Sequence, residues 1–582
     1  MSAPPVVVEA ETADIAIGTQ GIERLTTGLA RRPRPVLLLF FVSLGLLLPM
    51  LIWGLPSTGD DSASHLRWQY FYSRQMWDSD PFPRWIRDLA DGFGSPAFFI
   101  YPPLPHFVAA LLAPASDGIA WLHRRLAIAI TLACFVGAVG AFTWLKQVTR
   151  ERNTALIGAM VYTLAPYHLF VDTYFRTAYA ELWGLAWAPF AFAGLHLLAS
   201  RRRAGVALTI LGVSGLLLSH APSALILVPT ALVYAGLLAL PARRWDVLAW
   251  AGAAACSAVL IAGLYLATAL TQQKYIHTSE LYTGYYNFYN WLMFAPNPVS
   301  KRAFDMSGLL QATLTFVLAS APLSAPGRRD DARATWRRLA VATVIGTVLL
   351  SFMMTRFSAP IWTLLPFAQK IQFPWRLQTA QTLLLALSSV LFLRALRPRS
   401  PWRDILPLLA LAAINIAMFQ HAPSRFGMPG LADTHETPEY TLGDTIGNAG
   451  RFAGGARLAL GAGAGGGARS ASLDLLRWEP RSIVFRIDAA APTEVLAKQF
   501  NYTGWTCRAA GDPAGTAASC RMLSTGSGDL VRVQVAPGRH DIELAMPETL
   551  QERAGKLVSV VGLVLAAAAI FAAGRRRRTS AP

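Results

Sequence analysis

The amino-acid sequence predicts a polytopic α-helical membrane protein of about twelve helices, with a β-rich domain near its C-terminus. Of its 582 residues, 53% are hydrophobic and 15% are charged, whereas soluble proteins contain roughly a quarter charged residues. About twelve apolar runs approach the roughly 20 residues that a helix needs to cross a bilayer. Before the last run, the sequence alternates hydrophobic and polar residues in short segments, as β-strands do.

The positions of the basic residues predict how these helices are oriented. The net charge of +18 would also suit a nucleic-acid-binding protein, but the basic residues form short clusters between the apolar runs. With a cytoplasmic N-terminus, every major cluster falls on the cytoplasmic side, as the positive-inside rule predicts. We therefore expect a multi-pass protein of a bacterial cytoplasmic (inner) membrane, with both termini cytoplasmic, surrounded by membrane lipids and without a nucleic-acid partner. The runs are 35–53, 126–145, 154–171, 182–199, 205–219, 221–240, 247–270, 307–324, 339–354, 379–393, 405–419 and 557–573, and the clusters are Arg31–Arg34, Lys146–Arg152, Arg201–Arg203, Arg243–Arg244, Arg328–Arg338, Arg394–Arg403 and Arg575–Arg578.

The chain divides into four expected regions. The first apolar run begins only at Pro35, so we expect a cytoplasmic tail and no cleavable signal peptide. The apolar stretch 98–113 carries three prolines in its first half, which disfavour a spanning helix. We expect interfacial or re-entrant helices there, within a long first outer loop. The regions are 1–34 (tail), 35–420 (transmembrane domain, with the first outer loop at 56–125), 421–553 (extracytoplasmic β-rich domain) and 554–582 (final helix and basic tail).

The β-rich domain is predicted from alternating runs separated by Pro, Gly and Asp turns, namely RSIVFRID, TEVLAKQF, LVRVQV and HDIELAM. They predict a small β-sandwich tethered by the final helix. Cys507 and Cys520 both lie in this domain, and an extracytoplasmic location permits disulfides, so we expect them to be bonded. Cys134 and Cys256 lie in apolar runs and are expected to be free thiols.

The first candidate for chemistry is the start of the first outer loop, where Asp60, Asp61 and His65 follow Gly59. Asp61 and His65 are four residues apart, so on a helix their side chains share one face. A carboxylate beside an imidazole could bind a metal or act as a general base. The alternative is a helix N-cap formed by the two aspartates, with a histidine at the surface.

The rest of this loop mixes aromatic residues, prolines and arginines, among them Arg84 and Tyr101. Such a surface could hold the phosphate and sugar of a lipid, or it could form an interfacial aromatic belt without a ligand.

Further polar residues lie at the outer ends of later helices. Asp172, Arg176 and Glu181 belong to a short second outer loop. They either take part in a site, or Arg176 and Glu181 form an ion pair that seals the loop. His220 lies in a tight turn, where a histidine is more often a satisfied turn residue than a ligand. Trp375 and Arg376 precede the tenth helix. A basic residue on the outer side runs against the positive-inside trend and suggests phosphate binding.

Other enzyme classes lack support, because the sequence contains no P-loop, GxSxG, HExxH or CxxC motif. Their absence argues against an ATP-driven pump and the usual hydrolases.

A series of motifs runs along residues 35–573: GDDSASHL, PFPRWIRDLADGFGSPAFFIYPPLPHF, APYHLFVDTYFRTAYAE, LLSHAPSAL, IQFPWR, TPEY, FNYTGWTC and PGRHDIELAMPETLQERAGKLVS. In order and spacing this series resembles the bacterial membrane proteins of the YfhO-like and "6-pyruvoyl-tetrahydropterin synthase-related" group. That group is similar to the GT-C superfamily of polyprenyl-phosphate-sugar-dependent glycosyltransferases. A soluble pterin enzyme would need a zinc-binding histidine set that this sequence lacks.

The resemblance implies an enzyme that moves a sugar from a polyprenyl-phosphate-linked donor to a cell-envelope glycan or lipid acceptor on the outer face of the membrane. The GT-C superfamily uses an acidic residue of the first outer loop as general base or metal ligand, and Asp61 matches that position, with Asp60 as its neighbour. A divalent metal (Mg or Mn) stays open as a cofactor, with Asp61 and His65 as its ligands. Many members of the superfamily with clear metal dependence carry further acidic motifs, and this chain has few of them. The expected substrate-binding residues are Arg84, Tyr101, Arg176, Glu181, His220, Trp375 and Arg376, and the expected acceptor-binding residues are Tyr502 and Trp505.

Two other functions stay open. A lipid or glycan transporter (flippase) would need polar residues at mid-membrane depth, whereas the polar residues here gather at the outer helix ends. A non-catalytic accessory protein of envelope assembly would use the same scaffold. Replacing Asp61 would abolish the function of an enzyme and leave that of an accessory protein nearly unchanged.

Overall fold

The computed structural model describes residues 34–116, 118–200, 204–296, 301–324, 331–395, 401–434, 437–461, 471–502, 504–510 and 519–575. The expected N-terminal tail, except for Arg34, lies outside the described residues. So do the cluster Arg201–Arg203 and parts of the expected basic clusters at 328–338, 394–403 and 575–578.

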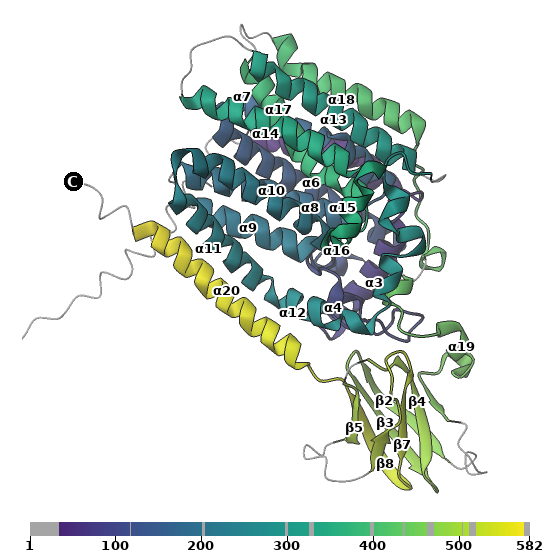
Figure 1. The fold of residues 1–582 in the computed structure, drawn as a ribbon. Helices are drawn as coiled ribbons and strands as arrows, with labels where there is room; N and C mark the ends of the chain where they lie inside the picture. Colours follow the sequence, from purple (N-terminus) through teal and green to yellow (C-terminus); the bar gives the residue numbers. More distant parts are fainter. Residues whose placement is uncertain are drawn as a thin grey trace, which may run out of the picture.

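The described chain is mostly helical, and its long helices form a bundle with a β-strand region at one end (Figure 1). Ten of the described helices are long and apolar enough to cross a membrane, which indicates a multi-pass membrane protein. They are α2 (Arg34–Trp53), α6 (Ile119–Thr149), α7 (Arg152–Leu164) continued by η2 (Tyr167–Phe175), α8 (Tyr179–Ala199), α10 (Ala221–Ala239) continued by η3 (Leu240–Ala242), α13 (Lys301–Ser324), α14 (Asp331–Met353), η9 (Pro374–Leu377) continued by α17 (Gln378–Ala395), α18 (Pro401–His421) and α20 (Leu550–Arg575).

The structure has fewer candidate spans than the twelve or so expected from the sequence, and the difference arises at two of the apolar runs. The run at 247–270 forms α11 (Trp245–Ile261) and α12 (Gly263–Gln272), which meet at a bend of 67° and together make an eleventh candidate span. The run at 205–219 forms α9 (Ala204–Ser219), whose 16 residues are short for a span. By length and composition, the described residues therefore contain ten or eleven candidate spans.

The first loop forms short helices that do not span, as its prolines predict. α3 (Ser62–Asp78) is followed by α4 (Ala97–Ile100), α5 (Leu104–Ala110) and η1 (Ala113–Ala115). Tyr101, Pro102 and Pro103 separate α4 from α5, and a proline can neither donate the backbone hydrogen bond nor avoid a clash with the preceding turn. The remaining short helices are η4 (Gln273–Tyr275), η5 (Thr278–Leu281), η6 (Gly284–Tyr286), η7 (Phe288–Trp291), η8 (Arg356–Ser358), α15 (Ala359–Leu364), α16 (Pro366–Gln369), η10 (Leu431–Asp433), η11 (Pro438–Tyr440), α19 (Thr445–Ala449) and η12 (Ala453–Gly455).

The β-strand region contains two antiparallel four-stranded sheets, with strand orders β1-β4-β7-β6 and β2-β3-β8-β5. The four alternating runs seen in the sequence correspond to β3, β4, β7 and β8, and buried side chains of both sheets meet in one core. The strands are β1 (Leu458–Leu460), β2 (Ser472–Glu479), β3 (Ser482–Ala489), β4 (Thr493–Phe500), β5 (Thr506–Ala509), β6 (Cys520–Met522), β7 (Leu530–Val535) and β8 (Gly538–Ala545).

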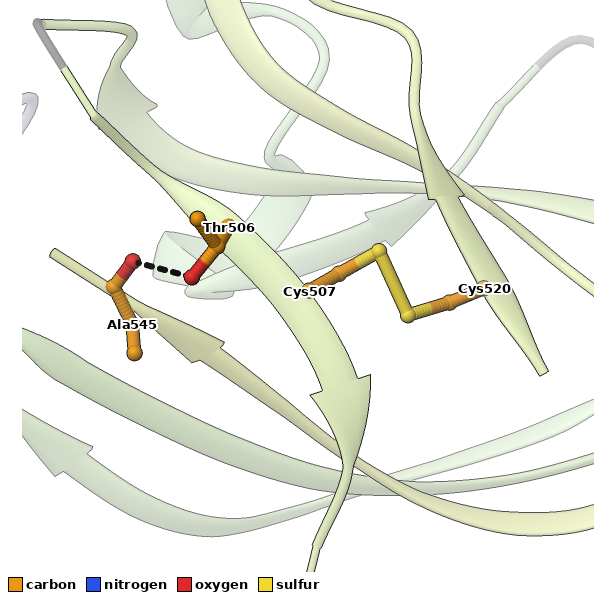
Figure 2. Close-up of a disulfide and its surroundings, with 4 residues drawn as sticks. All are labelled: Thr506, Cys507, Cys520 and Ala545. Atoms are coloured by element: carbon orange, nitrogen blue, oxygen red, sulfur yellow. Dashed lines mark hydrogen bonds between the residues drawn. A yellow bond between two sulfur atoms is a disulfide. The ribbon is translucent and has the colours of Figure 1, made fainter. Parts of the chain in front are cut away.

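A disulfide joins Cys507 and Cys520, as Figure 2 shows. Cys507 lies in β5 and Cys520 in β6, so the bond connects the edge strand of one sheet to the edge strand of the other. Thr506, beside it, donates to the carbonyl of Ala545 in β8 at 3.2 Å. Cys134 and Cys256 are free cysteines.

The first loop and the β-strand region share a single hydrophobic core. Trp85 stacks on Tyr502 at 5.6 Å between ring centroids, and Phe93 stacks on Phe500 at 5.2 Å. Trp85 Nε1 also donates to Gln499 Oε1 at 2.8 Å. Trp85 and Phe93 of the first loop therefore pack against the strands, whereas Trp77 of the same loop is exposed.

Candidate functional site

A cluster of charged side chains surrounds Arg176, and we call Arg176, Asp61, Asp172 and Glu181 the Arg176 cluster. Arg176 Nη2 lies 3.0 Å from Asp61 Oδ2, and Nη1 lies 3.0 Å from Asp172 Oδ1 and 2.8 Å from Glu181 Oε2. Three of the four residues are buried, whereas the Asp61 side chain is 38% exposed. Burial alone would lower the pKa of Arg176, but the surrounding carboxylates raise it above its ordinary value.

A change of helix type places Arg176 at the centre of this cluster. α7 ends at Leu164, and after Pro166 the chain continues as the π-helical segment η2, which Arg176 terminates. Pro166 cannot donate to the hydrogen-bond ladder of α7, and π-helical turns are frequent at functional sites. Glu181 lies in the first turn of α8, where the helix dipole favours a carboxylate. The segment expected to be a short outer loop is therefore largely helical.

Close backbone contact fixes the first loop against η2. The backbone N–H of Asp61 donates to the carbonyl of Arg176 at 3.0 Å, so both the backbone and the side chain of Asp61 contact Arg176. A Cβ on Gly59 would lie 2.5 Å from Ser62 Oγ and 2.6 Å from Thr177 Oγ1, so any larger residue would force these hydroxyls to move. Thr177 itself has a φ of 58°, a left-handed conformation that is strained for a β-branched residue.

Arg376 and Trp375 lie directly beside the Arg176 cluster. Arg376 Nε is 3.5 Å from Glu181 Oε2, and Arg376 Nη1 donates to Gln372 Oε1 at 2.9 Å. The guanidinium carbon of Arg176 lies 4.5 Å from the centroid of the Trp375 ring, a cation–π geometry. The structure thus brings together residues that the sequence places at the ends of four different helices.

Asp60 lies at the accessible edge of the site. Its side chain reaches solvent, yet burial by the surrounding protein and the charge of Asp61 raise the pKa of Asp60 to about 6, against the opposing effect of Arg176. A carboxyl group with this pKa exchanges its proton close to neutral pH, which suits a general acid or base.

His65 and Asp61 are joined through the helix backbone, not through their side chains. His65 N donates to the carbonyl of Asp61 at 3.1 Å, and the imidazole is buried among the rings of His106, Tyr101 and Tyr179. Burial lowers the pKa of His65 to about 4, so this side chain is neutral at physiological pH.

His106 is a buried histidine that the sequence did not single out. Gln69 Nε2 donates to the backbone carbonyl of His106 at 3.2 Å, so the Gln69 oxygen must be the acceptor in its 2.8 Å contact with His106 Nδ1. His106 Nδ1 therefore carries the proton, which leaves Nε2 as a bare acceptor that is buried without a partner among the described residues. Burial lowers its pKa well below the ordinary value.

His220 caps α10 and is a turn residue, as its position suggested. Its Nδ1 accepts from the backbone N–H of Ser223 at 3.3 Å and contacts the Ser223 hydroxyl at 2.7 Å. His220 also interacts electrostatically with Glu181, Arg176 and Arg376, so it lies near the Arg176 cluster.

Three of the expected binding residues have their contacts elsewhere, with α12 or within the core shared by the first loop and the β-strand region. Arg84 donates to Thr268 Oγ1 at 2.7 Å and to a backbone carbonyl of α12. Tyr502 and Trp505, expected to contact an acceptor, are buried, and Tyr502 also hydrogen-bonds Gln272. Both belong to the core that the first loop and the β-strand region share, so we do not assign them to acceptor binding.

Two further residues complete the cluster. The sequence placed Asp172 in the second outer loop without assigning it a role, although its position one helical turn before Arg176 could have paired the two. Tyr167, whose hydroxyl donates to Glu181 Oε1 at 2.7 Å, gave no such signal, because the contact depends on the packing of η2 against α8.

A metal site is not evident in the described part of the chain, where no group of three or more His, Cys, Asp or Glu residues is arranged to hold an ion. Comparisons with family models, with curated proteins and with solved structures found no match for this chain.

Proposed function

We propose that the protein is a glycosyltransferase that transfers a sugar from a polyprenyl-phosphate-linked donor to a cell-envelope acceptor on the outer face of a bacterial inner membrane. The observation that supports it is the position of Asp61. It is the accessible member of an otherwise buried charge cluster, and Arg176 holds one of its carboxylate oxygens at 3.0 Å. An accessible carboxylate in a fixed orientation is what a general base needs.

In this proposal, the end of the bundle that carries the Arg176 cluster and the β-strands faces the outside. Support comes from the described basic residues of Lys146–Arg152 and Arg243–Arg244, which lie at the turns α6–α7 and α10–α11. These turns are at the opposite helix ends from the Arg176 cluster, in agreement with the positive-inside rule.

The proposed reaction assigns different tasks to the charged residues. Asp61 takes the proton of the acceptor hydroxyl, whose oxygen bonds to the anomeric carbon of the donor sugar. The bond between that carbon and the phosphate oxygen breaks, and polyprenyl phosphate leaves with the electron pair. Arg176 already contacts three carboxylates, so we assign it to positioning Asp61. Arg376, with its longer contact to Glu181, is the better candidate for the donor phosphate.

Complementation of a deletion strain tests the proposal. Wild type, Asp61→Asn and Asp78→Asn are expressed, membrane insertion is verified, and surface glycans are profiled by mass spectrometry. Asp78 ends the same helix α3 and has only a 3.9 Å contact with Arg87, so its variant controls for loss of a carboxylate. We expect a glycan mass that disappears in the deletion and returns with wild type and Asp78→Asn only.

Full restoration of the glycan profile by Asp61→Asn would remove Asp61 as the base and would favour the accessory or transport functions. A deletion strain with an unchanged glycan profile would argue against the glycosyltransferase as a whole.

A further inference from the structure

A cavity of about 440 Å³ lies where the first loop, the β-strand region and α20 meet. Its wall comes from 79–84, from the turn between β2 and β3, from Met546 and from the start of α20. This volume is in the range of small-ligand sites. The cavity is separate from the proposed active site, because no residue of the Arg176 cluster lines it.

Most charged groups of the wall are paired within the protein. Arg481 Nη2 lies 2.8 Å from Glu552 Oε1, Lys556 pairs with Glu548, and Glu479 lies 3.7 Å from an arginine of β2. These residues need no ligand to balance their charge.

One cation and one anion of the wall have no opposite charge within ion-pair distance among the described residues. Arg84 is buried and donates to neutral acceptors, Thr268 Oγ1 at 2.7 Å and a backbone carbonyl of α12. Asp80 accepts from neutral donors, Gln75 Nε2 at 3.1 Å and a backbone N–H of the loop at 3.3 Å. The two residues are four positions apart and both face the cavity. A ligand that carries one negative and one positive group would balance both.

The surroundings of the cavity indicate that this ligand is amphipathic. The cavity borders Lys556 in α20, one of the candidate membrane spans. The next residues of that helix, Leu557, Val560 and Val561, are exposed. A polar headgroup in the cavity would leave its acyl chains along this apolar helix surface.

We propose that this cavity binds the headgroup of one zwitterionic phospholipid, with its phosphodiester on Arg84 and its ammonium group on Asp80. Arginine forms strong charge-assisted hydrogen bonds with phosphate oxygens. The site would anchor the β-strand region and α20 to the membrane surface, and it is independent of the sugar-transfer reaction proposed above.

Native mass spectrometry of the full-length protein in detergent tests the proposal. The probes are phosphatidylethanolamine, phosphatidylglycerol and diacylglycerol, which has no phosphate. We expect wild type to retain one phosphatidylethanolamine, to bind phosphatidylglycerol less tightly and not to retain diacylglycerol. Arg84→Gln should weaken phosphatidylethanolamine at least roughly tenfold, as expected for a lost charge-assisted contact. Equal retention by wild type and Arg84→Gln would overturn the proposal.

Asp80→Asn tests the ammonium contact separately. It should remove the preference for phosphatidylethanolamine over phosphatidylglycerol while both lipids still bind. A wild-type protein that retains both lipids equally would refute this half of the proposal. Binding of inorganic phosphate at least as tight as that of phosphatidylethanolamine would show that a free anion, not a lipid, is the ligand.

Two further variants control for folding and for general loss of charge. Arg425 is exposed and does not line the cavity, so Arg425→Gln should bind lipid as wild type does. Ser79→Trp fills the cavity from an exposed position and leaves the hydrogen bonds of Arg84 in place. It should reduce lipid retention without lowering the unfolding temperature. Unchanged retention in Ser79→Trp would overturn the proposal even if Arg84→Gln failed to fold.

Discussion

Arg176 is the residue on which the candidate site depends most, because its guanidinium contacts three carboxylates from three parts of the chain. A planar fork with several N–H donors can face Asp61 on one side and Glu181 on the other. Asp172 and Glu181 are buried, and a buried carboxylate without its cation is strongly destabilising. The same residue therefore stabilises the fold and orients the proposed base.

Arg176→Gln should lower the free energy of unfolding by about 3–5 kcal/mol, as removal of one partner from a buried ion pair does. Arg176→Lys should also be destabilised, because one ammonium group cannot replace the two-sided contact. The measurement is thermal unfolding of the purified protein in detergent.

Arg244→Gln is the matched control for Arg176→Gln. Arg244 pairs with Asp246 at 2.7 Å on the surface, where ion pairs contribute at most about 1 kcal/mol. If both variants unfold at the same temperature as wild type, the Arg176 cluster does not stabilise the fold.

Asp60 should make stability depend on pH between about 4 and 6. Its pKa is raised from 3.8 to about 6 in the folded protein, so in this window the folded state binds more protons than the unfolded state. The contribution of Asp60 to stability is therefore present at low pH and is lost as pH rises through 6. The unfolding temperature of Asp60→Asn should exceed that of wild type by a margin that grows from pH 4 to pH 6 and then stays constant. A margin independent of pH would contradict the raised pKa.

At the scale of elements, the site is made by the contact between the start of α3 and the end of η2. α3 begins at Ser62, directly after Asp61, and η2 ends at Phe175, directly before Arg176. Gly59 permits the close approach of these segments, and Thr177 accepts a left-handed backbone there. The position of Asp61 relative to Arg176 therefore depends on two residues that carry no charge.

Gly59→Ala should destabilise the protein by about 1–3 kcal/mol, as overpacking of a tight contact does, and should reduce function by moving Asp61. The hydroxyls of Ser62 and Thr177 would both clash with the new Cβ. Thr177→Gly removes one of these two hydroxyls and suits the positive φ, so the double variant should be less destabilised than the sum of the single variants. Thermal unfolding measures both.

Gly252→Ala is the control for this contact, because a Cβ at Gly252 in α11 meets no atom within 4 Å. It should leave stability unchanged or raise it slightly. Strict additivity of Gly59→Ala and Thr177→Gly would show that the two residues are not in tight contact.

At the scale of the whole molecule, the first loop and the β-strand region act as one body, because their side chains form one core. Trp85 is buried at the centre of this contact. Its indole stacks on Tyr502 and donates to Gln499, whose amide donates in turn to the carbonyls of Arg87 and Gly92. A region that follows the bundle in sequence is thus joined to the loop that carries the proposed base.

Trp85→Ala should weaken this connection by about 3–5 kcal/mol, as truncation of a buried tryptophan does. We expect the β-strand region of the variant to become sensitive to limited proteolysis at temperatures where wild type resists it. Trp245→Ala, at an exposed position in α11, should leave the proteolysis pattern unchanged. Resistance of Trp85→Ala equal to that of wild type would show that the two regions are held together by other contacts.

The sequence by itself determined the helices, the four main strands and the end of the bundle at which the polar residues gather. These features depend on local patterns: apolar runs of spanning length predict helices, and alternation with turn residues predicts strands. Asp61, Arg176, Glu181 and Arg376 could be named because they are charged residues at the outer ends of apolar runs, away from the cytoplasmic basic clusters. The short strands β1, β5 and β6 were not predicted, because three or four residues carry too little alternation, and in β2 most residues are exposed.

Only the tertiary structure decided what these residues contact. Asp61 and Arg176 are 115 positions apart, and their ion pair depends on the packing of the first loop against η2. The π-helical form of η2, the burial of Tyr502 and the separation of Arg84 from the Arg176 cluster likewise follow from contacts between segments distant in sequence. Burial and charge pairing are properties of neighbours in space, and the local sequence pattern does not specify those neighbours.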